Sequence, residues 1–230
     1  MSGGGGGGGG AVAAILRKEL KVEFRNKQTI NSYLILTVLI LAAFRFAFVA
    51  LDLEGSDLAA PVLWITIFFA GMFSLSPVYK RETDGATKAG LLLAPIPASA
   101  VFFGKLLASL IVMAGLELFT AVVFFAFFPF GVPDVLALAT IMALGTVGFI
   151  ALGSIISAIS ANLSQAEVML PVLLVPLLLF TVVMSAVSAT AAVFRGAGLA
   201  EVSDEVRFLA AFALVFVTAG YLLIGHVLEA

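Results

Sequence analysis

The chain of 230 residues contains no cysteine and only one histidine, His226, close to its C-terminus. Without cysteine the chain can form no disulfide, use no thiol nucleophile and offer no thiolate to a metal ion. One histidine cannot supply both axial ligands of a bis-histidine haem within the chain. Serine and aspartate are scattered over different predicted loops, so no catalytic centre is predicted around His226. We therefore expect no metal ion and no cofactor bound by this chain itself.

Nucleotide-binding motifs are missing as well. No G-x-x-x-x-G-K-[ST] pattern occurs, and the Gly104-Lys105 pair lacks the upstream glycine of a phosphate-binding loop. The net charge is -2, and no basic block beyond the N-terminal one could bind a phosphate backbone. The sequence therefore predicts neither a nucleotide site of its own, nor an enzyme, nor a nucleic-acid partner.

Charge is scarce throughout, and apolar residues are abundant. Only 11% of the residues are charged whereas 62% are hydrophobic, which is typical of an integral membrane protein and not of a soluble domain. A membrane-spanning helix needs about 20 apolar residues. On that basis we predict an all-α protein with six transmembrane helices, at residues Ile30 to Leu51, Ala60 to Val78, Ser99 to Phe128, Val135 to Ser160, Val168 to Val193 and Phe208 to Val227.

The residues before the first span divide into two segments. Residues 1–10 include eight consecutive glycines and are predicted to be a flexible, low-complexity segment rather than a cleaved signal peptide. Residues 11–29 are predicted to form an amphipathic helix lying on the membrane, with its basic residues toward anionic headgroups. Two acids, Glu19 and Glu23, fall on its apolar side. Either they pair locally, as Glu23 would with Lys27, or this side packs against a protein surface that carries a base.

Basic residues predict the orientation. Lysines and arginines precede the first span and surround the connection between the second and third, whereas the connection after the first span carries only acids. Because cytoplasmic loops are enriched in lysine and arginine, residues 30–230 are predicted to form a six-span domain with both termini in the cytoplasm. The membrane is then the cytoplasmic, or inner, cell membrane.

Two charged residues lie inside predicted spans, and such residues are functional candidates by default. Arg45 and Glu117 are at a similar predicted depth, roughly 22 to 27 Å from the inner surface at 1.5 Å per residue. They could pair with one another. Alternatively, Arg45 extends to the outer headgroups, and Glu117 is a protonated or water-facing carboxyl.

Small residues in the fourth predicted span indicate close helix packing. Gly153, Ser157 and Ala161 recur at four-residue spacing, which allows a neighbouring backbone to approach. The stripe fits packing within one chain or the seam of a homodimer. Trp64, near the outer end of the second span, is predicted to be an anchor at the membrane interface.

The stretch YKRETDGATKAGLLLAPIP, residues 79–97, is the most polar connection in the chain. It fits either an ordinary solvated turn between helices or a docking element for a partner. The candidate docking residues are Arg81, Asp84, Gly85 and Lys88.

From about Leu16 to its C-terminus the chain resembles the haem exporter protein B family (CcmB), the membrane subunit of an ABC transporter used in cytochrome c maturation. Each matching motif is short, but their order and the chain length together make a fairly specific set. The motifs are Ala60-Pro61-Val62-Leu63-Trp64, Asp84-Gly85, the run from Leu91 to Pro97, Gly104-Lys105, Leu144-Gly145-Thr146, Gly148-Phe149, Leu170-Pro171 and Val175-Pro176.

The resemblance implies an ABC-2-type exporter permease architecture with a cytoplasmic coupling loop at about residues 79–97. It also implies a separate ATPase subunit docked on that loop, other cytochrome c maturation membrane proteins as partners, and haem as a possible substrate. The chain departs from the family pattern at Val78, Arg81 and Ala86-Thr87, so only Asp84 and Gly85 carry over. An exporter of a lipid, glycan or drug, and a scaffold that releases haem from a partner without transporting it, are the alternatives.

Overall fold

The computed structural model of the protein describes residues 7–25, 27–51, 56–75, 97–129, 131–160 and 182–229. All regular structure in these ranges is helical, in agreement with the predicted fold class. The helices are α1 (Gly7–Arg25), α2 (Lys27–Ala50), α3 (Ser56–Leu75), α5 (Ala98–Phe127), α6 (Val135–Ser160), α8 (Met184–Phe194) and α9 (Ser203–Glu229).

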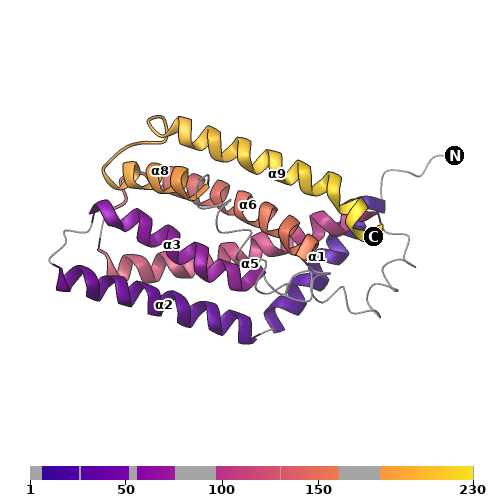
Figure 1. Ribbon diagram of the computed structural model, residues 1–230, viewed down its shortest axis with the longest axis horizontal. Coiled ribbons are helices and arrows are strands. Elements are labelled where there is room, and N and C mark those ends of the chain that lie inside the picture. The colour runs from indigo at the N-terminus through magenta and orange to yellow at the C-terminus, as the bar shows by residue number, and fades with distance from the viewer. Residues whose placement is uncertain are drawn as a thin grey trace.

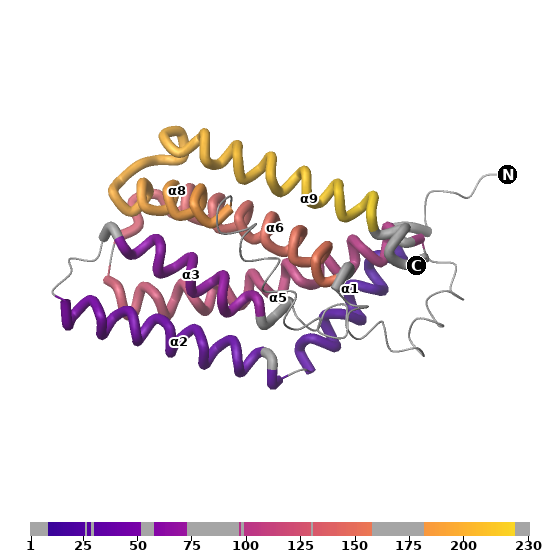
Figure 2. The backbone as a smooth tube through the Cα atoms, in the orientation of Figure 1, coloured from indigo at the N-terminus to yellow at the C-terminus, as the bar shows by residue number. Residues whose placement is uncertain are grey.

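The described helices α2, α3, α5, α6, α8 and α9 run along the long axis of the molecule, and α1 crosses one end of the bundle (Figure 1). Successive long helices run in opposite directions, as the tube of Figure 2 shows for α2 and α3 and for α5 and α6. Helix α5 lies centrally, because it packs against α1, α2, α3, α6 and α9. Helix α8 packs against α3, α6 and α9. The bundle therefore has an interior to which most of the chain contributes.

The long helices follow from uninterrupted runs of leucine, valine, phenylalanine and alanine. In an apolar phase each backbone N–H and C=O must bond within its own segment, which a helix achieves. Helix α5 has 30 residues, which corresponds to a length of about 45 Å and exceeds the hydrocarbon core of a bilayer, about 30 Å. Its start is set by Pro97, whose extended backbone (φ -65°, ψ 138°) precedes the first helical residue.

Four predicted spans are confirmed as helices long and apolar enough to cross a membrane: Ile30–Ala50, Ser99–Phe127, Val135–Ser157 and Ser203–Leu223. The last begins at Ser203 and not at Phe208, because Asp204 and Glu205 occupy its first turn, where carboxylates favour the positive end of the helix dipole. The apolar parts of α3 and α8 are shorter, Leu58–Met72 and Met184–Phe194. Most of the predicted fifth span lies outside the described residues, so the number of six spans stays a prediction.

Helix α1 has different limits from the predicted interfacial helix. It begins at Gly7, inside the segment predicted to be flexible, and ends at Arg25. Residues 27–29, which were predicted to belong to the interfacial helix, form the start of α2. Added Cβ atoms on Gly9 and Gly10 would meet nothing within 4 Å, so no tertiary contact of these glycines explains the extension. Once a helix is nucleated, each further residue adds one backbone hydrogen bond, which offsets the poor helix propensity of glycine.

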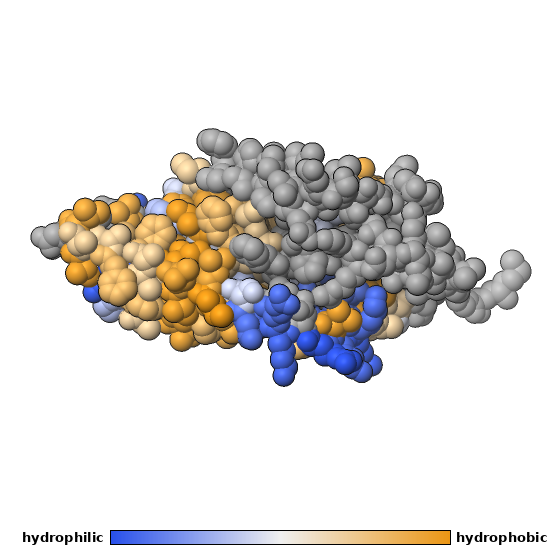
Figure 3. Space-filling view, turned by 60° about the horizontal axis from the view of Figure 1, so that its bottom comes forward, coloured by the Kyte–Doolittle hydropathy of each residue, from blue (hydrophilic) through white to orange (hydrophobic). Residues whose placement is uncertain are grey.

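The outer surface of the bundle is apolar. Large hydrophobic side chains are exposed along α2, α5 and α9, and they include Ile35, Leu39, Phe46, Leu118, Val122, Leu214, Val215 and Leu222. Figure 3 shows one face, on which apolar surface covers one end and hydrophilic residues gather beside it. Such a surface is stable in contact with lipid tails and would aggregate in water.

The small-residue stripe of α6 is buried within this single chain. Gly153, Ser154 and Ser157 are all buried, and α6 packs extensively along α9. Ala161 lies outside the described residues. The stripe therefore serves packing between helices of one chain, and nothing in the described part assigns it to a homodimer.

Candidate intramembrane site

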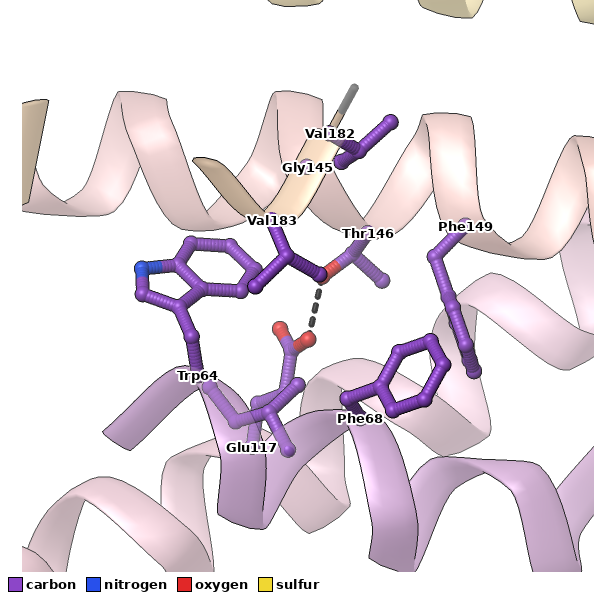
Figure 4. Close-up of a pocket in the computed structure, with 9 residues that line it drawn as sticks. Trp64, Phe68, Glu117, Gly145, Thr146, Phe149, Val182 and Val183 are labelled. Carbon is purple, nitrogen blue, oxygen red and sulfur yellow. Dashed lines mark hydrogen bonds between the residues drawn. The ribbon is translucent and has the colours of Figure 1, made fainter. Parts of the chain in front are cut away.

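A buried carboxyl lies at the centre of the bundle. Glu117 on α5 is 6% exposed, and its side chain points from α5 toward α6 (Figure 4). Thr146 on α6 donates its hydroxyl hydrogen to Glu117 Oε1. Both residues are deep inside apolar helices, so the bond joins two helices where water is scarce. A carboxyl in such a place is costly, and an ionisable residue kept inside a membrane bundle is a candidate for a function.

The carboxyl borders a cavity between α3, α5, α6 and the turn that leads into α8 (Figure 4). The volume open to the centre of a water molecule is about 10 Å³, which is room for about one water. The lining is otherwise aromatic and aliphatic, and consists of Trp64, Ile67, Phe68, Glu117, Gly145, Thr146, Phe149, Val182 and Val183. Few polar atoms therefore face the carboxyl.

Trp64 forms one wall of the cavity, so its predicted position as an anchor at the membrane interface is wrong. It is 3% exposed, and its indole Nε1 donates to Thr190 Oγ1 of α8 at 2.9 Å. Gly145 makes this position available, because a Cβ added there would lie 2.5 Å from the Trp64 ring. The contact joins the lone tryptophan to a glycine of another helix. The sequence of neither helix alone reveals such a pair.

A second polar contact lies one turn further along α5. Tyr33 Oη of α2 and Thr120 Oγ1 are 2.9 Å apart, and Thr120 also donates to the Leu116 carbonyl at 3.0 Å. Thr37, one turn after Tyr33, is fully buried, and its hydroxyl has no hydrogen-bond partner among the described residues. Hydroxyls from α2 and α6 therefore contact α5 within one turn of each other, at Thr120 and at Glu117.

Arg45 and Glu117 do not form the predicted pair. Arg45 is exposed on α2, whereas Glu117 is buried and bonded to Thr146. No ion pair found between described residues joins the two. The predicted similar depth is also wrong, because Tyr33 contacts Thr120 and Phe48 contacts Phe128, which places Arg45 beside the part of α5 that follows Glu117. Arg45 also lies away from the buried side of α2, which carries Thr37, Leu41 and Phe48.

Glu19 and Glu23 of α1 are partly buried, and the sequence left open whether they pair locally or face a protein surface. The side chain of Glu19 is 16% exposed and pairs locally with Lys18, whose Nζ lies 3.1 Å from Glu19 Oε1. Glu23 is also partly buried. Helix α1 packs on α5, where Ile15 lies so close to Gly104 that an added Cβ would meet it at 2.6 Å. The apolar side therefore contacts protein of the same chain.

Lysine and arginine mark the end of the bundle where α1 lies. Lys105 is 2% exposed within α5, so its side chain lies inside the bundle and not on the surface of a loop. The other basic residues that the structure describes at this end are exposed, namely Arg17, Lys18, Lys21, Arg25 and Lys27. The orientation of this end toward the cytoplasm stays a prediction. The four candidate docking residues Arg81, Asp84, Gly85 and Lys88 lie outside the described residues.

At the opposite end of the bundle, one carboxylate links two segments of the chain. Asp134 accepts hydrogen bonds from the Ala137 N–H at 2.9 Å and from the Leu199 N–H at 3.1 Å, and so links the start of α6 to the turn before α9. The Ala137 N–H, followed by the Leu199 and Leu136 N–H groups, lowers the pKa of Asp134, against a smaller opposing effect of desolvation. Asp134 thus has a structural role that its position in a predicted loop did not reveal.

A sequence model of a known protein family, described as CcmB protein, matches residues 10–230. No curated protein matches the chain. The matched range contains every described helix from the start of α2 to the end of α9, and most of α1. The family is one of membrane permeases for haem transport in cytochrome c-type biogenesis and not of enzymes. The chain belongs to the CcmB family, the haem exporter protein B family.

Proposed function

We propose that this protein is the permease subunit of an ABC exporter that handles haem for cytochrome c maturation and is driven by a separate ATPase subunit. The observation that carries the proposal is the family match over residues 10–230, nearly the whole chain. Members of one family that match over this length share an architecture, and the transport role is inferred from that membership.

The structure supports a role inside the membrane. The exterior of the bundle is apolar, whereas hydroxyls and one carboxyl are buried at its centre. Hydroxyls inside a membrane bundle join neighbouring helices, and an ionisable residue there marks a candidate pathway or relay. A permease that alternates between two packings needs such contacts, because each can form in one packing and break in the other.

The ATPase is proposed to dock on the loop at about residues 79–97, with Arg81, Asp84, Gly85 and Lys88 as contacts. ATP would bind to the partner alone. Reversal of one interfacial charge, Asp84→Lys, should weaken co-purification of the ATPase by more than tenfold, since an unpaired buried charge costs several kcal/mol. Unchanged co-purification of the ATPase with a normally inserted Asp84→Lys variant would exclude this docking contact.

Haem is proposed as the substrate and not as a resident cofactor. The cavity beside Glu117 has room for about one water, so it would have to open widely to pass a haem. This small volume also fits the second candidate, a subunit that uses ATP-driven motion to release haem from a partner protein. The two candidates are distinguished by enclosing haem in sealed vesicles that contain the chain and the ATPase. An exporter moves the haem across the bilayer, whereas a subunit that only releases haem from a partner does not.

A further inference from the structure

Glu117 is the one acid of the described residues that is buried in the middle of a long apolar helix, and its environment restricts its charge. Its hydrogen-bond partner is the Thr146 hydroxyl. The rest of its surroundings consists of the aromatic and aliphatic walls of the cavity. A carboxylate in such surroundings keeps little of the hydration that stabilises its charge in water.

The helices packed against α5 bring few titratable groups toward Glu117. Helices α6 and α8 contain none, and α3 contains only Asp57, in its first turn. From α2 the phenol of Tyr33 is the neighbour, while Arg45 is exposed. On α5 itself the nearest base, Lys105, is twelve residues earlier, about 18 Å along the helix.

The two remaining helices, α1 and α9, carry their charges near the ends of the bundle. Those of α1 are its basic residues and two acids, close to the start of α5. Those of α9 are Asp204, Glu205 and Arg207 at its start, with the phenol of Tyr221 exposed and His226 and Glu229 in its last turns. No base among the described residues is therefore placed to neutralise a charged Glu117.

We propose that Glu117 is a proton-binding site inside the membrane-spanning bundle, and that the packing of α5 on α6 seen here is that of the protonated site. One proton from bulk water binds a carboxylate oxygen, and the carboxyl becomes neutral. The inference goes beyond the proposed function, because it depends neither on the substrate nor on the ATPase.

The small volume of the cavity connects the proton to the packing of the helices. When the proton leaves, the new charge needs water or additional donors. The cavity has room for about one water, so further hydration requires α3, α6 or the turn before α8 to move away from α5. Loss of the proton is thus expected to open the interface that Trp64 borders.

Trp64 allows a direct test, because it is the single tryptophan of the chain and lines the cavity. The full chain in lipid nanodiscs is titrated from about pH 5 to about pH 9 while Trp64 emission is recorded. We expect a reversible shift to longer wavelength as the pH rises, as water reaches the indole. The shift should be absent in Glu117→Gln and unchanged in the control Glu201→Gln, whose carboxyl is exposed.

A wild-type emission that does not change over this range, or an equal shift in Glu117→Gln, would overturn the proposal. A second measurement needs no variant. Dicyclohexylcarbodiimide enters membranes and reacts with protonated carboxyls, whose proton passes to a carbodiimide nitrogen as the oxygen bonds to the central carbon. Mass spectrometry of labelled wild-type membranes should locate the adduct at Glu117, and an unlabelled Glu117 would contradict the proposal.

Discussion

The contact between Trp64 and Gly145 allows the packing of the site to be tested by one methyl group. In Gly145→Ala the new Cβ would lie 2.5 Å from one ring carbon of Trp64 and 3.0 Å from the next. The indole cannot simply retreat, because its nitrogen is held at 2.9 Å from Thr190 on α8. Either the helices separate or the hydrogen bond to Thr190 breaks.

Both responses lower the free energy of unfolding. Overpacking of this kind costs about 1–3 kcal/mol, and a lost interhelical hydrogen bond in a membrane protein costs about 0.6–1.7 kcal/mol. Since either response suffices, the expected loss is about 1–3 kcal/mol. Reversible unfolding of the chain in mixed micelles with increasing denaturing detergent measures it, with Trp64 emission as the signal.

Two further variants isolate the cause. Gly115→Ala is the matched control, since Gly115 is exposed on α5 and an added Cβ meets nothing within 4 Å. It should stabilise by up to about 1 kcal/mol through helix propensity. In the Trp64→Phe background the smaller ring should leave room for the added methyl group, so that Gly145→Ala costs much less, as circular dichroism would show. Equal losses in both backgrounds would refute the contact as the reason.

Three other outcomes follow from particular residues. Gly104→Leu should release α1 from α5, because even a Cβ meets Ile15 at 2.6 Å, and faster proteolysis of α1 with an intact bundle would show this. Asp134 has a lowered pKa in the folded chain, so its stabilising effect is present above its ordinary value of about 3.9 and is lost as the pH falls below that; thermal unfolding at pH 7 and at about pH 3 should differ less in Asp134→Ala than in the wild type. Single cysteines at Thr87 and Glu54 should react with an impermeant thiol reagent from opposite sides, and labelling of both from outside would contradict the predicted orientation.

Composition was sufficient to predict an all-helical membrane protein, because apolar runs of this length have few other stable structures. Four span positions were predicted to within a few residues for the same reason. The start of the last helix was missed by five residues, since Asp204 and Glu205 lowered its hydropathy while they favoured its first turn. Hydropathy measures the free energy of transfer into lipid, whereas the start of a helix is also favoured by carboxylates near the N–H groups of its first turn.

The site was predicted only in part. Glu117 was identified from its position within an apolar run, but its partner was predicted to be Arg45 and is Thr146. Both the relative depth of two residues on different helices and the direction of a side chain around the bundle depend on which helices are neighbours and how they are shifted along one another. Trp64 was misplaced for the same reason, because its contact with Thr190 joins residues 126 positions apart.

The central claim is that this CcmB-family chain handles haem for cytochrome c maturation together with a separate ATPase. The most direct test is the amount of covalently bound haem in c-type cytochromes, measured by haem staining in cells from which the chain has been deleted. The account predicts that haem-loaded cytochrome c is lost while the unloaded polypeptide is still made, and that the chain restores the loading only when the partner ATPase is active. Normal loading without the chain, or restoration without ATP hydrolysis, would contradict it.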